Sequence, residues 1–466
     1  MKLDNKWQVL IIISIGIFMS TLDGSILNIA NPTIAREMSV DMKQVQWVVT
    51  AYMLVITSTL LFFGKLGDRI GSHKIYTFGF LGFAIGSLFC SISTSLILLI
   101  ASRAFQAFGA SMMMATGIGI VSNTFPPEER GKALGLTGSM VGIGNMTGPS
   151  LGGILVAKFG WPVIFLLNIP VGLIGFYLAY RFLPSQPVNS QDKKFDFPGI
   201  LLFSIAAIVL VLSLSVGDSI QFGPLLAGII LLACFYIFEK KSPSPMLDFE
   251  LFRVKPFLYG NILGCLAYVS QTWVIFLMPF FMERLLHFSP AYSGLMMTIP
   301  PIFMAVTAPF AGSLSDKFGP TRLTSISFIL LSGAHLTFST LGQDASIFRI
   351  AGGLVLLGIG MGFFGSPNNS SILSSVPQEK AGYTGGFIST VRNFSFSIGI
   401  AVSASIFSLL LNIYQENLSY AIAYSASTHW VYRISALITL SGLLISVLSR
   451  NERKSSKSVL LEQEGV

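Results

Sequence analysis

Two residues of opposite charge, Asp23 and Arg103, lie inside long apolar stretches of the sequence. An ionisable side chain within a membrane span is costly, so it marks a functional site by default. Asp23 lies ~9 Å and Arg103 ~11 Å from the outer ends of their stretches, at about 1.5 Å per residue. We therefore expect them to face one cavity and to sense each other's charge. Burial favours the neutral acid and Arg103 favours the carboxylate, which would let Asp23 exchange protons. The alternative is a static ion pair that only aligns two helices.

A second candidate is the segment from Gly64 to Lys74, whose motif recurs later in the chain. The sequence reads GKLGDRIG over 64–71 and GSLSDKFG over 312–319, which is 248 positions further on. Glycines permit close approach of helices, and a carboxylate can accept hydrogen bonds from helix N-terminal amides. We expect a gate here rather than a basic loop that only fixes topology. The residues assigned to the gate are Gly64, Asp68, Arg69, Gly71, Lys74 and Asp316.

A third candidate is a run of glycines that recur every fourth residue. Such glycines line one face of a helix and let another helix pack closely. A proline beside them removes a backbone hydrogen bond and kinks the helix. Packing alone is the usual interpretation of such a face, but the sequence GPSLGG over 148–153 is more specific. The residues of this motif are Gly144, Gly148, Pro149, Gly152 and Gly153.

A weaker set of residues could line a substrate cavity. Aromatic rings can stack on flat or cationic molecules, although aromatic residues make up 12% of the chain and most must pack or face lipid. Arg392 could pair with Asn368, Asn369 or backbone carbonyls, or it could bind an anionic group. We interpret His335 as a helix–helix contact. We interpret Glu283 as an exposed surface acid, the alternative being an acid that attracts cations at the outer mouth. The cavity candidates are Asn28, Tyr52, Gln106, Tyr268, Trp273, Phe276 and Arg392.

The elements that must position these residues are membrane-spanning helices. Hydrophobic residues make up 52% and charged residues 11% of the 466 residues, and the mean hydropathy is +0.72. A soluble chain carries about 25% charged residues, so the composition excludes a soluble enzyme, a disordered protein and a disulfide scaffold. The net charge of +8 does not indicate nucleic-acid binding, because the basic residues lie at the ends of apolar stretches.

Catalytic chemistry finds no support in the sequence. Cys90, Cys234 and Cys265 have neither metal-ligand nor disulfide spacing. We find no phosphate-binding glycine loop with a lysine, no nucleophile elbow and no metal-ligand cluster. We therefore expect neither an enzyme nor an ATP-driven pump, and we expect no cofactor and no metal.

Fourteen apolar stretches can cross a hydrocarbon core of ~30 Å as helices. With a cytoplasmic N-terminus, 21 of the 29 Lys and Arg residues fall on the cytoplasmic side and 6 outside. This bias predicts that both termini are cytoplasmic. The stretches run over residues 7–29, 45–64, 75–94, 96–120, 132–156, 162–183, 198–216, 222–238, 257–282, 291–312, 321–341, 348–371, 383–411 and 430–448.

The repeated motif divides the chain into two copies of one unit. A second echo, Pro127–Gly131 against Pro377–Gly382, has nearly the same offset. We therefore predict two six-helix halves with two helices inserted between them, and a substrate site near the midplane. The predicted domains are the N-terminal half over 1–183, linkers and inserted helices over 184–256, the C-terminal half over 257–449, and a cytoplasmic tail over 450–466.

These motifs, taken in order, resemble those of the major facilitator superfamily and, within it, the fourteen-span drug:proton antiporters. Gly64–Lys74 is similar to the superfamily's loop between its second and third helices. Arg103–Gly109 is similar to its RxxQGxG motif, with Ala107 in place of the usual Gly. Gly144–Gly153 is similar to the span 5 motif of exporters, and Leu22–Pro32 to the span 1 motif of the drug family.

The resemblance covers about residues 7–449 and implies an all-α polytopic protein of a bacterial cell membrane, with the major facilitator fold. It implies proton-driven export by alternating access, with Asp23 as the proton-responsive acid and Arg103 as its partner.

The motifs also imply roles for the residues that open and close the transporter. Asp68 would hold the gate by docking near Gly382–Gly386. Gly148 and Pro149 would seal the halves against leak.

The resemblance also implies a substrate class. We expect small hydrophobic drugs or biocides, mostly cationic, exchanged for protons by a monomer in the lipid bilayer. Some relatives carry an acid in span 10 that helps with divalent cations, but residues 291–311 contain none here. Monovalent cationic or zwitterionic amphiphiles are therefore favoured. The alternatives are a dedicated exporter of one physiological amphiphile, such as a lipid, siderophore or peptide, and a non-transporting membrane sensor on the same scaffold.

Overall fold

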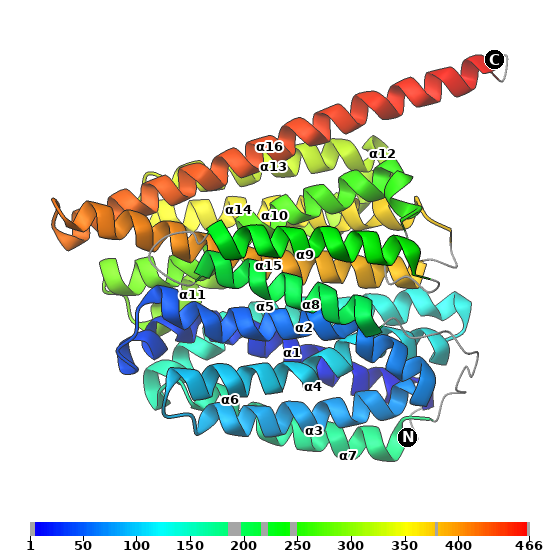
Figure 1. The fold of residues 1–466 in the computed structure, drawn as a ribbon, viewed down its shortest axis with the longest axis horizontal. Coiled ribbons are helices and arrows are strands. Elements are labelled where there is room, and N and C mark those ends of the chain that lie inside the picture. The colour runs from blue at the N-terminus through cyan, green and yellow to red at the C-terminus, as the bar shows by residue number, and fades with distance from the viewer. Residues whose placement is uncertain (1–4, 185–196, 216–221, 243–248, 378–380, 464–466) are drawn as a thin grey trace. The chain divides into compact units, whose positions relative to one another are not determined.

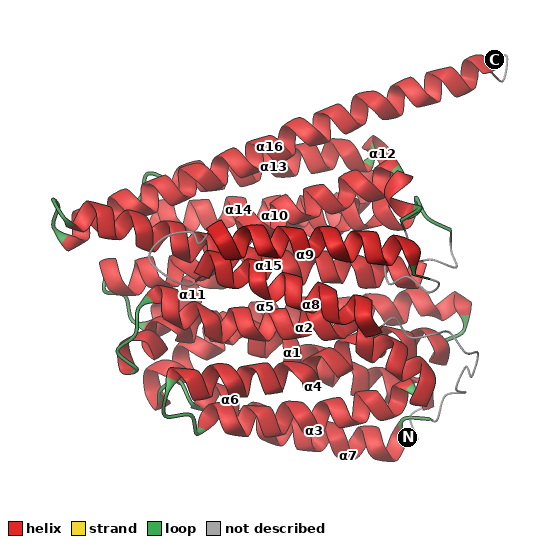
Figure 2. Ribbon diagram, viewed as in Figure 1, coloured by secondary structure: helices red, strands yellow, loops and turns green. Residues whose placement is uncertain are grey.

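The computed structural model describes residues 5–184, 197–215, 222–242, 249–377 and 381–463. These residues form helices and the loops that connect them, and none of them forms a strand (Figure 2). The all-helical prediction is therefore confirmed for the described part of the chain. Contacts divide the chain into two compact units, which we call unit 1 and unit 2.

Unit 1 comprises Met1–Leu247 together with two later segments, Phe276–Thr298 and Phe396–Ser408. The two later segments come from the predicted C-terminal half. The helices that lie wholly in unit 1 are α1 (Asn5–Glu37), α2 (Met42–Ile70), α3 (Ser72–Ser91), α4 (Leu96–Thr124), α5 (Pro127–Phe159), α6 (Val163–Leu166), α7 (Asn168–Phe182), α8 (Phe197–Ser215), α9 (Phe222–Lys241), η2 (Phe281–Leu285) and α11 (Pro290–Met297).

The helices of unit 1 pack in a connected set. Helix α3 packs against α4 and α7, which lie on either side of it in Figure 1. Helix α1 packs against α5, and α2 packs against α4. The predicted inserted helices α8 and α9 pair with each other, and α8 also contacts α2. Helix α2 begins at a capping box, because Asp41 and Gln44 each accept a hydrogen bond from the other's backbone N–H.

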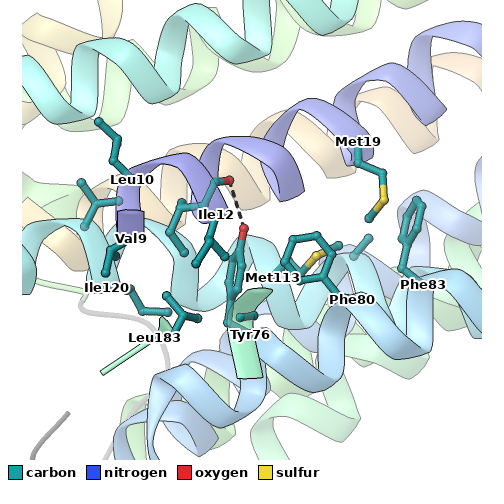
Figure 3. Close-up of a cluster of buried hydrophobic side chains, with 14 of the residues drawn as sticks. Val9, Leu10, Ile12, Met19, Tyr76, Phe80, Phe83, Met113, Ile120 and Leu183 are labelled. Carbon is teal, nitrogen blue, oxygen red and sulfur yellow. Dashed lines mark hydrogen bonds between the residues drawn. The ribbon is translucent and has the colours of Figure 1, made fainter. Parts of the chain in front are cut away.

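A hydrophobic cluster holds α1, α3, α4 and α7 together. Leu10, Phe80 and Met113 are among its buried side chains (Figure 3). Tyr76 lies within the cluster and donates a hydrogen bond of 3.0 Å from its hydroxyl to the backbone carbonyl of Ile13. A buried hydroxyl without a partner would be costly, so this bond fixes the distance between α1 and α3.

Unit 2 comprises Asp248–Ile275, Ile299–Ser395 and Leu409–Val466. Within it α13 packs against α14 and α16, and α12 packs against α14. Two helices, α10 and α15, contribute residues to both units. The helices of unit 2, with these two, are η1 (Leu251–Arg253), α10 (Lys255–Phe280), α12 (Ile299–Phe318), α13 (Pro320–Phe338), α14 (Ile347–Leu373), α15 (Ala381–Gln415) and α16 (Tyr420–Gln463).

The repeated motif forms the same kind of turn in both copies. Gly71 joins α2 to α3 with φ of 105°, and Gly319 joins α12 to α13 with φ of 85°. Side chains other than glycine avoid this left-handed region because Cβ collides with the backbone. The final glycine of each motif is therefore required by the sharp reversal between two helices.

Gly319→Ala is expected to destabilise the protein by about 1–2 kcal/mol, because the added Cβ strains the backbone. No atom lies within 4 Å of that Cβ position, so the backbone is the only source of strain. The matched control is Gly352→Ala in α14, where the Cβ also meets open space. There alanine is expected to be neutral or to stabilise by up to about 1 kcal/mol. Thermal unfolding of the purified proteins measures both, and equal stabilities of the two variants would contradict the assignment.

The helices match the positions of the predicted spans. A helix, or two consecutive helices, covers most of each of the fourteen predicted stretches. Eleven stretches within the described residues are long and apolar enough to cross a membrane. Helices α2 and α13 fall outside that set, and Pro198–Ser213 of α8 is apolar but shorter. The count of fourteen spans and the cytoplasmic termini therefore stay predictions.

Candidate functional site

A buried ion pair joins α1 to α4 in unit 1. Arg103 Nη1 on α4 donates to Asp23 Oδ2 on α1 at 2.7 Å. Asp23 is 2% exposed and Arg103 is fully buried. The structure thus brings together the two charged residues that the sequence placed at one depth.

Amide side chains complete the contacts of the Asp23 carboxylate. Its Oδ1 accepts from Gln106 Nε2 at 3.1 Å and from Asn168 Nδ2 at 2.7 Å. Gln106 also donates to Ser87 Oγ at 2.8 Å. Both carboxylate oxygens are therefore engaged by N–H donors from three neighbouring side chains.

Asn168 is not among the residues predicted from the sequence, and Gln106 is predicted there as a motif residue and a cavity candidate but not as a partner of Asp23. Asn168 is the first residue of α7 and is buried. Its signal was an amide within an apolar stretch, because such an amide needs a polar partner at membrane depth. Gln106 is also fully buried and serves the ion pair. It lies one helical turn after Arg103, to which it is hydrogen-bonded.

The guanidinium of Arg103 is enclosed by further groups. Its Nε donates to the backbone carbonyl of Val48 at 3.3 Å. Its Cζ lies 3.9 Å from the centroid of the Tyr52 ring and 5.6 Å from that of Phe165. Tyr52 therefore packs on the buried cation as a cation–π partner. It is 2% exposed, so it offers no ring face to a ligand in this state.

The glycines of α5 face two different helices. A Cβ on Gly148 would lie 2.7 Å from Ser25 Cβ, and one on Gly152 would lie 2.6 Å from Ile26 Cγ1, both on α1. Gly144 meets α1 as well, since its carbonyl accepts a hydrogen bond of 3.1 Å from Ser25 Oγ. These three glycines therefore let α1 approach α5, as the small-residue spacing predicts.

The opposite side of the motif receives α11. A Cβ on Gly153 would collide with the carbonyl oxygen of Pro290, and one on Gly294 would collide with that of Pro149. Helix α11 thus packs on α5 backbone to backbone, and both helices need glycine there. Within unit 1 the exporter-like motif joins α5 to a segment of the predicted C-terminal half.

The structure describes the side chains of some of the predicted gate residues but not of others. Gly71 forms the turn described above, and its carbonyl accepts from Lys74 N at 3.1 Å. Arg69 is exposed, and a Cβ on Gly64 would meet open space. The side chains of Asp68 and Asp316 lie outside the described residues, so the docking of Asp68 stays a prediction.

Of the remaining cavity candidates, Trp273 and Phe276 are fully buried. Phe276 packs on Phe280, with ring centroids 5.4 Å apart. Asn28 is partly exposed on α1, and its Nδ2 donates to the carbonyl of Gly24 at 3.1 Å. Neither buried aromatic ring is open to a ligand in this state.

Tyr268 and Arg392 belong to the parts of α10 and α15 that lie in unit 2. Tyr268 packs edge-to-face on Phe364, with ring centroids 5.9 Å apart. Arg392 is partly exposed, and it is close enough for its charge to act on the Tyr268 phenol. Asn368 Nδ2 donates to the carbonyl of Gly260 at 3.1 Å, and the described residues show no hydrogen bond between Asn368 and Arg392.

A small hollow in unit 2 lies on one side of Asn368. Gly260, Leu263, Thr324 and Ser371 are among the residues that line it. Its volume of about 20 Å³ has room for a water molecule, which needs roughly 10–15 Å³. An organic ligand does not fit there, so this hollow is not a substrate site.

Two minor predictions have different outcomes. His335 is buried between α13 and α16, 3.3 Å from Ser435 Oγ and stacked on Tyr432, which confirms it as a helix–helix contact. Glu283 is not the exposed surface acid that we predicted, because it is partly buried in η2. Its carboxylate interacts electrostatically with Arg36. The burial arises because Phe276–Thr298 belongs to unit 1, where α11 packs on α1 and α5.

The described residues contain no group of three or more His, Cys, Asp or Glu side chains that could hold a metal ion. The chemistry of these residues is therefore that of a buried, hydrogen-bonded ion pair in one unit and a partly exposed arginine in the other. Neither arrangement contains a nucleophile paired with a base, and both lie within helices long and apolar enough to cross a membrane.

Residues 13–400 match the family model described as Major Facilitator Superfamily. The riboflavin transporter RibZ of Clostridioides difficile (strain 630) is 47% identical over 454 residues, covering 97% of this chain and 99% of that protein. The multidrug resistance protein Stp of Mycobacterium tuberculosis (strain CDC 1551 / Oshkosh) is 30% identical, covering 88% and 77%. Among solved structures, the peptide transporter POT in complex with sulfate aligns with a TM-score of 0.70 at 14% identity, covering 95% of each chain. At that identity the structural likeness shows the fold alone.

Proposed function

The chain belongs to the Major Facilitator Superfamily of membrane transporters, and from this premise we propose that it carries riboflavin or a closely related flavin across the bacterial cell membrane. The observation that carries the proposal is the 47% identity to a riboflavin transporter over 97% of this chain and 99% of that one. The identity to the multidrug resistance protein is 30%. A shared fold does not choose a ligand, but a relative of this identity over the full length supports a shared substrate class.

The charges of the described residues also favour a ligand that is not a cation. Asp23 is fully engaged by Arg103, Gln106 and Asn168. In unit 2 no acidic residue occurs in the apolar interior of α10, α13, α14 or α15, whereas Arg392 does. A cation near Arg392 would be repelled and would find no counter-charge. Riboflavin is uncharged at neutral pH, and its flat ring carries carbonyl groups while its ribityl chain carries hydroxyl groups.

We therefore expect the substrate to be a neutral or anionic molecule with a flat ring, in place of the mostly cationic drugs that the sequence suggested. Coupling to protons through Asp23 remains part of the proposal, because the ion pair is the one deeply buried carboxylate–guanidinium contact among the described residues. A proton entering down 100 mV supplies ~2.3 kcal/mol, which is enough to drive a useful gradient of a neutral molecule.

Counterflow in proteoliposomes tests the substrate without assuming a direction or a driving force. Vesicles that contain the full chain are loaded with unlabelled riboflavin and diluted into labelled riboflavin. We expect transient accumulation of label inside, several-fold above that in protein-free vesicles, and competition by lumiflavin but not by lipophilic cations. Exchange of lipophilic cations with no exchange of flavin would contradict the proposal.

The second candidate function is proton-coupled drug export. It is favoured by the close packing of α1 and α11 on the glycines of α5, a motif similar to that of exporters, and by the 30% identity to the multidrug resistance protein Stp. Proton release from energised inside-out vesicles on addition of several unrelated drugs would support this candidate. If no drug in the panel causes proton release while flavin counterflow is intact, the result would contradict drug export and support flavin transport.

A further inference from the structure

We propose that Arg392 selects the transported ligand by donating hydrogen bonds to the oxygen-rich edge of a flat ring that packs beside Tyr268. The inference rests on the proposed transport function and deepens it, because it names the edge of the ligand that the protein reads. It concerns residues of unit 2 only.

The first observation is the depth of Arg392. It lies on α15, within the stretch Thr384–Gln415 that is long and apolar enough to span a membrane. It lies eight positions after the start of that stretch, which is ~12 Å at about 1.5 Å per residue. A charge at this depth avoids lipid and faces the protein interior or a water-filled surface. Arg392 is partly exposed, so we place it on a water-accessible surface of unit 2.

The second observation is that Arg392 has no fixed partner. Among the described residues no ion pair or hydrogen bond involves its guanidinium. Arg103, which lies deep in another span, is held by Asp23, Gln106 and the carbonyl of Val48. An unpaired guanidinium inside a span is costly, and a ligand that brings acceptor oxygens would satisfy its donors.

The third observation is the surroundings of Arg392. Its charge acts on the phenol of Tyr268. One helical turn before Tyr268, a Cβ on Gly264 would lie 3.7 Å from the Tyr268 ring and 3.9 Å from Asn368 Nδ2. Gly264 therefore leaves the backbone of α10 bare between the ring and the amide. Beside Asn368, the Oδ1 of Asn369 is buried and accepts no hydrogen bond from the described residues.

These groups together define a ligand class. A guanidinium is a planar set of N–H donors that suits carbonyl, carboxylate or phosphate oxygens. The unused Oδ1 of Asn369 can accept an N–H. Tyr268 is 8% exposed and packs on Phe364, so the edge of its ring is what a ligand can contact. The dione edge of a flavin ring presents two carbonyls that flank one N–H, which matches a donor and an acceptor set beside a ring. A cationic ring finds no acceptor charge here and is repelled by Arg392.

Equilibrium binding to the purified full chain in lipid nanodiscs tests the inference. The probes are riboflavin and lumiflavin, which has the ring without the ribityl chain, and the readout is flavin fluorescence. Arg392→Gln is expected to raise Kd about tenfold or more for both flavins, as loss of a charge-assisted hydrogen bond predicts. Arg392→Lys keeps the charge but loses the planar donors, and it should lie between wild type and Arg392→Gln.

The matched control is Arg433→Gln on α16, an exposed arginine of unit 2 whose guanidinium lies 5.2 Å from the Trp430 ring. It should leave Kd unchanged within about twofold, as exposed charges contribute little. Thermal unfolding shows whether each variant is folded. If Arg392→Gln does not fold, the Kd of Arg392→Lys is used for the test. An unchanged Kd for lumiflavin in both Arg392 variants would overturn the inference.

A second arm separates this inference from the flavin proposal. Wild type and Arg392→Glu are titrated with two flat dyes of opposite charge, fluorescein and ethidium. We expect wild type to prefer the anion by about tenfold and Arg392→Glu to prefer the cation, since the sign of the selecting charge is reversed. If wild type binds no flavin, the flavin proposal fails, whereas a reversal of dye preference still supports Arg392. The same preference in both proteins would overturn the role of Arg392 alone.

Discussion

The neutral pair Asp23→Asn/Arg103→Gln is expected to fold nearly as well as wild type and to lose proton-driven accumulation of substrate. Each single substitution leaves one buried charge without its partner, which costs about 3–5 kcal/mol. The double variant removes both charges and keeps amide donors and acceptors beside Gln106 and Asn168. Most of the lost stability should therefore return, which thermal unfolding of the four proteins in a double-mutant cycle measures.

Transport by the same double variant separates the two interpretations of the pair. If Asp23 carries the coupling proton, accumulation under an imposed pH gradient should fall about tenfold or more while counterflow persists. If the pair only aligns helices, the double variant should accumulate substrate as wild type does. That result would contradict a role of Asp23 in proton coupling.

Lys6 and Glu129 provide a matched control for this experiment. They form an ion pair of 2.7 Å between α1 and α5, with side chains 26% and 43% exposed. Because water screens a pair at the surface, Lys6→Gln/Glu129→Gln should cost no more than about 1 kcal/mol. It should leave proton-driven accumulation unchanged.

Gly294→Ala is expected to loosen the contact between α11 and α5 and to open it to water. The new Cβ would collide with the carbonyl oxygen of Pro149. Overpacking of this kind costs about 1–3 kcal/mol, which shifts an open–closed equilibrium by about fivefold or more toward the open state. The contact lies at the predicted outer ends of its spans, so the closed state on that side should become less populated.

Cysteine labelling measures this shift. Ser293 is fully buried next to Gly294, and Ser293→Cys in a background without native cysteines reports its exposure to an impermeant maleimide on whole cells. Gly294→Ala should raise the labelling rate about fivefold or more. The control is Gly24→Ala on α1, whose Cβ meets open space. Equal labelling in all three backgrounds would show that the glycine contact does not hold the closed state.

The sequence predicted the fold class and the principal contact because both depend on simple physical costs. Apolar stretches of sufficient length become helices in lipid, and opposite charges within them pair because an unpaired charge is costly there. Asp23 and Arg103 therefore meet as their depths predicted. The glycines of α5 were also assigned to close packing, although the sequence did not show that they serve α1 on one side and α11 on the other.

The rest depends on tertiary contacts that spacing alone does not specify. Tyr52 looked like a ring for a ligand, yet it packs on the buried Arg103. Asn168 was not selected, because a single amide in an apolar stretch has no local pattern. The break between α11 and α12 at Thr298 had a local signal that was not used, since Pro300 and Pro301 have no N–H to continue a helix.

The turn glycines Gly71 and Gly319 bear on the history of the chain. Their motifs differ at four of eight positions, yet both end in a glycine with positive φ at the same point between two helices. We infer that the two motifs derive from one ancestral segment that already made this turn, because their side chains differ while the backbone conformation is the same. The turn would then be a fixed joint in both copies, around which the neighbouring side chains were free to become different.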